Sequence, residues 1–154
     1  MANPRHNTQT TNRRGAMGGG MMKRAGYKAG EIVGKQKNFP ECYYNLGNVH
    51  LNIGESKEAI VYYNQALSLN KFYYKALNNK GVAFIKLHNY NEAIKHLNLA
   101  LKIKSDYHEA LSNLGVAFMG KKEFEKALDY FNKALKINEN FFNAHVQKIF
   151  IQRR

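Results

Sequence analysis

The sequence predicts an all-α protein built from a repeated pair of antiparallel helices, and three observations lead to this fold class. Glycine and alanine recur at a fixed interval of 34 residues, which is typical of stacked repeats. Within one repeat, residues 92–101 carry apolar side chains at positions i, i+1, i+4, i+7 and i+8, which is helical spacing. The only prolines are Pro4 and Pro40, so helices can form without interruption from Glu41 onwards.

Four separate columns of residues share the interval of 34. They are Gly47, Gly81 and Gly115; Ala59, Ala93 and Ala127; Tyr63, Leu97 and Phe131; and Ala66, Ala100 and Ala134. We interpret the glycine as the point where the two helices of a repeat approach closely, because a side chain there would hold them apart. The first alanine of each repeat would face that glycine from the second helix for the same reason.

The columns divide the chain into repeats at 40–73, 74–107 and 108–141. Short polar breaks, such as residues 52–55 and 120–123, separate the two helices of a repeat. Residues 142–154 supply only one more helix, which we expect to cap the apolar face of the third repeat. This helix carries Ile149, Phe150 and Ile151 in a row, so either the chain continues in a longer parent protein or this patch meets a partner, including a second copy.

These residues resemble the tetratricopeptide repeat (TPR) family, in which Leu-Gly, an aromatic residue and two alanines recur at the same spacing. The resemblance implies an all-α, right-handed superhelical solenoid of antiparallel helix pairs, with three TPR units plus a C-terminal capping helix in a TPR domain at 40–154. The pattern departs from the family at Lys71, Ser105 and Glu139, which stand where proline is usual, and at Lys80, which replaces the leucine before glycine.

The resemblance also implies that the first helices line the concave groove of the superhelix, where a partner would bind. The groove residues that we expect to contact an extended peptide are Tyr44, Asn45, Asn48, Asn79, Val82, Lys86, Asn113, Val116 and Gln147.

One column of this groove consists of the amides Asn45, Asn79, Asn113 and Gln147. A primary amide offers both donors and acceptors, so a row of amides can hold a peptide by its backbone with little regard to its sequence. The column is similar to the asparagine ladder in the TPR superhelix of O-linked N-acetylglucosamine transferases. An alternative explanation is that asparagine is simply common in this chain.

A second ligand mode of the family is the clamp that chaperone-adaptor TPR domains close on a C-terminal carboxylate. Asn48 and Asn79 match two of its positions, but Tyr44, Glu109 and Asn113 stand at the positions that need a basic residue. Without cations the clamp loses its charge-assisted hydrogen bonds, and Glu109 would repel a carboxylate. The sequence therefore disfavours the clamp.

Residues 1–39 match no repeat and are predicted to form a flexible, basic arm rich in Gly, Met and Thr. They hold eight Lys and Arg residues against a single acid, Glu31, in a chain whose net charge is +13. Such an arm can neutralise phosphates, but we expect only weak, salt-sensitive and non-specific binding to nucleic acid.

We expect a protein–protein interaction scaffold or adaptor that binds a protein or peptide and is not an enzyme. No nucleophile–base grouping or metal-ligand spacing is present in the sequence, so no cofactor and no metal is expected. The alternatives are a TPR targeting segment of a larger enzyme, such as a glycosyltransferase, and a nucleic-acid-associated adaptor that acts through the arm. No apolar run reaches the ~20 residues of a membrane span, and the lone cysteine, Cys42, agrees with a cytoplasmic protein.

Overall fold

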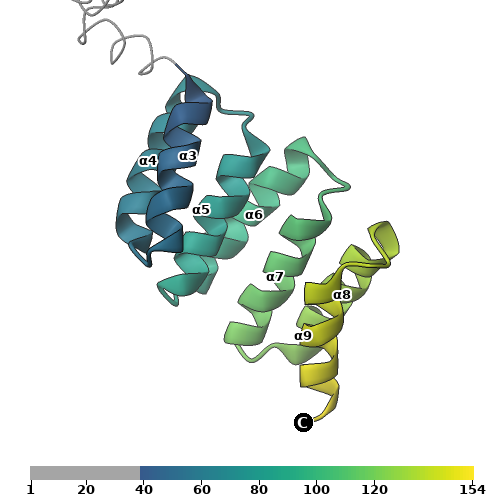
Figure 1. Ribbon diagram of the computed structural model, residues 1–154. Coiled ribbons are helices and arrows are strands. Elements are labelled where there is room, and N and C mark those ends of the chain that lie inside the picture. Colours follow the sequence, from purple (N-terminus) through teal and green to yellow (C-terminus); the bar gives the residue numbers. More distant parts are fainter. Residues whose placement is uncertain (1–38) are drawn as a thin grey trace, which may run out of the picture. The chain divides into compact units, whose positions relative to one another are not determined.

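The computed structural model describes residues 39–154, which form seven α-helices and no strand. All of the predicted N-terminal arm except Phe39 lies outside the described residues. The helices run antiparallel to their neighbours and stack in chain order (Figure 1). They are α3 (Pro40–Asn52), α4 (Ser56–Leu69), α5 (Tyr74–Lys86), α6 (Tyr90–Ile103), α7 (His108–Gly120), α8 (Phe124–Ile137) and α9 (Phe142–Gln152).

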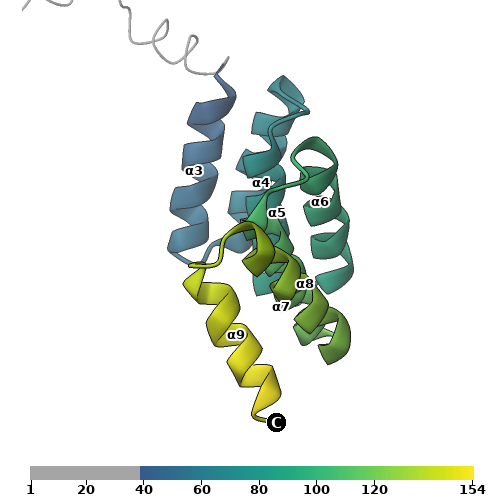
Figure 2. The ribbon, with the colours of Figure 1, turned by 90° about the vertical axis from the view of Figure 1, so that its right-hand side faces the viewer.

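Each helix packs against the next one along the chain, and the first helices α3, α5, α7 and α9 also contact one another in sequence. In the turned view, α3 and α9 lie on one side, and α6 and α8 lie on the other (Figure 2). The second helices therefore form an outer layer, and the first helices form an inner layer. This arrangement confirms the prediction of an all-α solenoid built from helix pairs.

The glycine column lies at the seam between the two helices of each repeat. A Cβ added at Gly47 would come within 2.5 Å of the ring of Tyr63, and one added at Gly115 within 2.6 Å of the ring of Phe131. The rings of Tyr63 and Phe131 are fully buried, so they have no room to withdraw. The close helix approach that the sequence predicted is therefore present. In α9 the equivalent position holds Ile149, which is half exposed.

The turn between the helices of a repeat also follows the 34-residue period. Gly54, His88 and Lys122 occupy the same position in their repeats, and each has a positive φ, of 89°, 58° and 64° respectively. The residue after each of them donates its backbone N–H to a carbonyl five residues earlier, which closes the helix with a Schellman motif. Asn52 and Gly120 are the last residues of α3 and α7, so each break is shorter than the sequence analysis expected.

An aromatic residue precedes the first helix of every repeat and of the capping helix. The four residues Phe39, Tyr73, Tyr107 and Phe141 follow the interval of 34, and each is the N-cap of its helix. The ring of Tyr107 packs edge-on against Tyr74 at a centroid distance of 5.0 Å, and that of Phe141 against His108 at 4.8 Å. Tyr107 and Phe141 thus each join their own first helix to the preceding first helix.

The two end helices differ from the interior ones in their burial. Val49 on α3 is 55% exposed, whereas the equivalent residues Ala83, Ala117 and Ile151 are 0%, 0% and 8% exposed. The helices α5, α7 and α9 each pack against the second helix that precedes them. No described helix precedes α3, so this face of α3 is left uncovered within residues 39–154. At the other end, α9 buries Ala144 and Ile151 against the cluster around Phe131, and it leaves Ile149 and Phe150 about half exposed. Residues 142–152 thus pack on the third repeat.

Candidate functional site: an amide-lined groove

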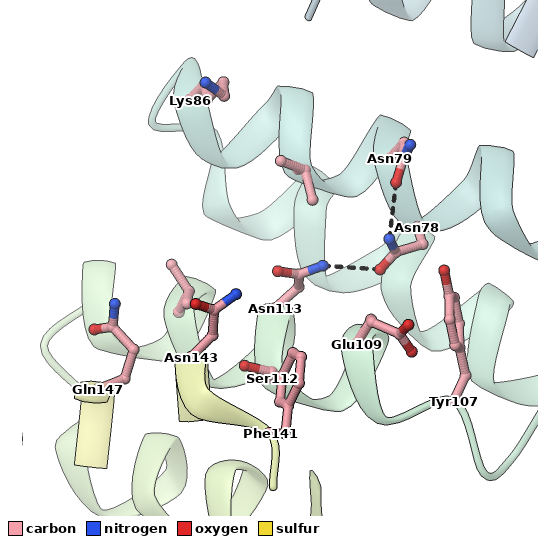
Figure 3. A pocket seen from close by; sticks show the side chains of 12 residues that line it. Asn78, Asn79, Lys86, Tyr107, Glu109, Ser112, Asn113, Phe141, Asn143 and Gln147 are labelled. Atoms are coloured by element: carbon pink, nitrogen blue, oxygen red, sulfur yellow. Dashed lines mark hydrogen bonds between the residues drawn. The ribbon is translucent and has the colours of Figure 1, made fainter. Parts of the chain in front are cut away.

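An open pocket of about 840 Å³ lies on the inner layer of helices. Its walls come from α5, α7 and α9, together with two of the aromatic N-caps (Figure 3). Polar side chains outnumber apolar ones along the walls. The lining residues are Asn78, Asn79, Val82, Lys86, Tyr107, Glu109, Ser112, Asn113, Val116, Phe141, Asn143 and Gln147.

Six of the nine groove residues expected from the sequence line this pocket. They are Asn79, Val82, Lys86, Asn113, Val116 and Gln147. Tyr44 and Asn48 lie next to it, because both accept hydrogen bonds from the side-chain amide of Asn79. Asn45 is exposed on α3 and is not among the lining residues. The pocket thus brings together three of the four residues of the amide column.

The asparagines are joined to one another by a chain of side-chain hydrogen bonds. Nδ2 of Asn113 donates to Oδ1 of Asn78 at 2.9 Å, and Nδ2 of Asn78 donates to Oδ1 of Asn79 at 2.9 Å (Figure 3). Nδ2 of Asn79 then donates to Oδ1 of Asn48 at 2.8 Å and to the hydroxyl of Tyr44 at 3.2 Å. This chain of hydrogen bonds therefore runs from α7 through α5 to α3.

This chain of hydrogen bonds extends into the core of the first repeat. The hydroxyl of Tyr63, a fully buried residue of α4, donates to Oδ1 of Asn48 at 2.8 Å. Burial raises the pKa of the Tyr63 phenol well above its ordinary value, so the group stays protonated and keeps its role as donor. Among residues 39–154, no buried side-chain N or O atom is left without a hydrogen-bond partner. The inner layer is thus a polar network with all of its buried members satisfied.

The hydrogen bonds between the asparagines leave each amide with a different number of donors and acceptors for a ligand. Both N–H groups of Asn79 are used, by Asn48 and Tyr44, so only its carbonyl oxygen has a remaining lone pair. Asn113 uses a single N–H, toward Asn78, and keeps its carbonyl oxygen and its second N–H. Of the linked asparagines on the pocket wall, Asn113 therefore has the most to offer a bound backbone.

The sequence analysis missed the two aromatic N-caps of the pocket, Tyr107 and Phe141. The signal was present, because Phe39, Tyr73, Tyr107 and Phe141 form an aromatic column with the same interval as the glycines. It also did not anticipate the linking role of Asn78. This residue is only 4% exposed, and it makes hydrogen bonds with both Asn79 and Asn113.

Two charged residues of opposite sign line the pocket. Lys86 and Glu109 are well separated, with the carboxylate beside Tyr107 (Figure 3). Burial raises the pKa of the Tyr107 hydroxyl, and the nearby charge of Glu109 raises it further. Oε2 of Glu109 lies 3.3 Å from Nδ1 of His108. The pocket is thus negative at one end and positive at the other.

Residues 39–154 contain no cluster of three or more His, Cys, Asp or Glu side chains that would suit a metal ion. None of their helices is long and apolar enough to cross a membrane.

The helix pairs, the glycine seams and the inner groove define a helical repeat domain, and a comparison with protein-family models identifies its family. The tetratricopeptide repeat model matches residues 40–73, 74–107 and 108–141. These matches cover most of the described chain, so the protein belongs to the tetratricopeptide repeat family. A comparison with curated protein sequences found no significant match.

Many solved structures have the same fold. The first TPR domain of human RPAP3 is 22% identical, with a TM-score of 0.73 over 76% of this chain and 92% of that one. The first TPR of Spaghetti, solved with the HSP90 peptide SRMEEVD, is 23% identical, with a TM-score of 0.70 over 74% and 90% of the two chains. The MamA protein is 30% identical, with a TM-score of 0.61; the match covers 67% of this chain and 56% of that one.

Proposed function

We propose that this protein is an interaction scaffold whose groove binds an extended segment of another polypeptide. The observation that carries the proposal is the row of amides on the groove wall, formed by Asn78, Asn79, Asn113, Asn143 and Gln147. Amides pair with peptide N–H and C=O groups, which every ligand sequence possesses. The apolar side chains of Val82 and Val116 lie among these amides and add contacts for ligand side chains.

Two similar structures support a peptide as the class of ligand. The first TPR of Spaghetti was solved with an HSP90 peptide, and the second TPR domain of human RPAP3 with the HSP70 peptide SGPTIEEVD. Both peptides end in the acidic sequence EEVD. The groove of the present protein holds the carboxylate of Glu109 instead of a full set of cations, so we do not extend that acidic specificity to it.

The experiment that tests the proposal is a selection from a displayed library of random peptides with the full-length protein. Selected peptides are synthesised, and their affinity is measured by fluorescence anisotropy for the wild type and for Asn113→Ala. We expect the substitution to weaken binding by roughly tenfold, the value of one or two lost hydrogen bonds to a bound backbone. Methylation of single backbone nitrogens in the peptide should weaken binding at a few positions, whatever the side chain there.

Asn132→Ala provides the matched control, because Asn132 is an exposed asparagine on the outer helix α8. It should leave the affinity unchanged. If the selected peptides bind the wild type and Asn113→Ala equally well, they bind elsewhere and the groove proposal is wrong. If the library yields no binder, recognition of an extended peptide is excluded as well.

A further inference from the structure

We infer that the end of the groove around Glu109 is a specificity subsite for a basic side chain, Lys or Arg, of the bound peptide. This inference rests on the proposed function, and it adds the chemical class of ligand side chain that the groove selects. The subsite consists of the Glu109 carboxylate, the rings of Tyr107 and Phe141, and the hydroxyl of Ser112. All four residues line the same pocket (Figure 3).

Glu109 has an incompletely compensated charge. Its side chain is 43% exposed, and no Lys or Arg within residues 39–154 lies at ion-pair distance from it. The neighbouring lysine on the preceding loop, Lys104, is paired with Asp106 at 3.4 Å and does not reach Glu109. A carboxylate at the wall of a pocket favours a cationic ligand group, because the pocket walls exclude part of the water that would screen the pair.

His108 lies directly beside the carboxylate of Glu109. Its Nδ1 lies 3.3 Å from Oε2 of Glu109, and its Nε2 lies 3.3 Å from Nδ2 of Asn138. Since the amide nitrogen of Asn138 is a donor, Nε2 acts as the acceptor and the proton of a neutral ring sits on Nδ1, the ring nitrogen beside Glu109. The His108 ring is further fixed by its edge-on contact with Phe141.

The aromatic rings suit the same kind of ligand. Tyr107 and Phe141 are both half-buried, and both line the pocket with Glu109. An ammonium or guanidinium group is attracted to the face of an aromatic ring, and its aliphatic stem packs against apolar surface. A carboxylate with aromatic rings beside it therefore recognises both parts of a Lys or Arg side chain.

Lys86 fixes where in the groove the basic side chain binds. It lines the same pocket at a distance from Glu109 and repels a cation from its own end. The net charge of the whole chain is +13, which disfavours basic peptides in general. A preference for Lys or Arg would therefore arise locally, against the charge of the molecule.

The test uses the same peptide selection with the full-length wild type and with Glu109→Gln, which keeps the size and polarity of the side chain. We expect Lys or Arg to be enriched at one position of the peptides selected by the wild type and not by Glu109→Gln. In a synthesised peptide, replacing that Lys by norleucine should weaken binding to the wild type about tenfold and leave binding to Glu109→Gln nearly unchanged. Glu109→Lys should reverse the preference toward an acidic residue.

Glu58→Gln is the matched control, since it removes the same charge from an exposed position on α4 and should keep the preference for Lys or Arg. If the wild type selects peptides without a basic preference, or if Glu109→Gln keeps the preference, the subsite is wrong while the peptide groove stands. If nothing is selected, the groove proposal fails, and the subsite fails with it.

Discussion

Asn113 on α7 donates a hydrogen bond to Oδ1 of Asn78 on α5, a residue 35 positions earlier in the chain. The bond joins the second and third repeats through polar side chains, beside the apolar contacts that hold a solenoid together. Since Asn78 is buried and Asn113 lies on the pocket wall, the same amide chain both supports the inner layer and presents groups to a ligand. Repeat stability and recognition are therefore coupled in this groove.

The glycine seam predicts the cost of adding a single methyl group. Gly115→Ala should lower the free energy of unfolding by about 1–3 kcal/mol, because the new Cβ would meet the fully buried ring of Phe131. Urea denaturation followed by circular dichroism measures the change. Asn132→Ala, on the exposed face of α8, should have little effect. Equal midpoints for the two variants would contradict the close approach.

The hydroxyl of Tyr63 allows one hydrogen bond of the network to be removed without a change of shape. Tyr63→Phe should destabilise the domain by about 1 kcal/mol, since Asn48 loses a buried donor. The ring itself fits, because Phe131 occupies the equivalent position of the third repeat. Tyr62→Phe serves as the control, because Tyr62 is partly exposed. If both variants are as stable as the wild type, the bond to Asn48 contributes nothing.

The left-handed turn residues predict a stabilising substitution. Lys122→Gly should raise the free energy of unfolding by about 0.5–1 kcal/mol, because glycine adopts the positive φ of 64° without strain. Lys121→Gly, one residue earlier and in right-handed helical geometry, should destabilise the protein. Thermal unfolding of the two variants measures the contrast. The same sign for both substitutions would be inconsistent with the Schellman turn.

His96 predicts a loss of stability in acid. Burial is the main cause that lowers the pKa of His96 below its ordinary value, and the nearby Lys80 and Lys95 add to it, against the opposing effect of Glu92. The unfolded chain then takes up the proton at a higher pH than the folded one, so protonation favours unfolding. The stability should be complete above about pH 6.5 and should fall as the pH drops through that value, until the folded pKa is passed.

Substitution of His96 by tyrosine isolates this effect. Tyr62 and Tyr130 hold the equivalent position in the other repeats, and a phenol does not titrate in acid. Between pH 7 and pH 5 the wild type should lose more stability than His96→Tyr, as measured by chemical denaturation at each pH. Parallel pH profiles for the two proteins would assign the acid sensitivity to other histidines.

The uncovered face of α3 predicts that the same substitution changes stability by very different amounts at equivalent positions of two repeats. Val49→Lys should change the free energy of unfolding by no more than about 0.5 kcal/mol, because Val49 is exposed. Ala83→Lys places the same charge where α4 covers α5, at a cost of several kcal/mol, which is comparable with the ~5–15 kcal/mol stability of a typical domain. Circular dichroism should show a folded Val49→Lys and a largely unfolded Ala83→Lys.

The sequence was sufficient for the repeat architecture because small residues at the seams have one structural explanation. A glycine opposite a buried ring, as in Gly47 and Tyr63, is needed only where two helices touch closely. The resemblance to the TPR family suggested the groove face of the first helices, and Asn79, Asn113 and Gln147, which it places there, line one pocket of the structure. Helix ends were less accurate, because His88 and Lys122 adopt a turn conformation that neither residue type signals.

The hydrogen bonds and the exact lining of the groove could not be predicted from the sequence. The hydrogen-bond partner of an asparagine depends on the rotamers of both side chains. The bond between Asn78 and Asn113 therefore could not be predicted from sequence spacing. Asn45 belongs to the amide column by its number, yet it lies on the exposed surface of α3, outside the pocket. Tyr107 and Phe141 lie just before helices, outside the positions from which the groove was predicted, although their column was visible in the sequence.

Ile149 affects how closely another helix can pack against α9. The helix that pairs with α3, α5 or α7 reaches within van der Waals distance of a bare backbone at glycine. On α9 a branched side chain stands at that point, so a helix that docks there with a large side chain opposite Ile149 must keep a wider separation. A pair as tight as those at the glycines would require a small residue on the docking helix, from this chain or another, so Ile149 selects which helices can pack at this end.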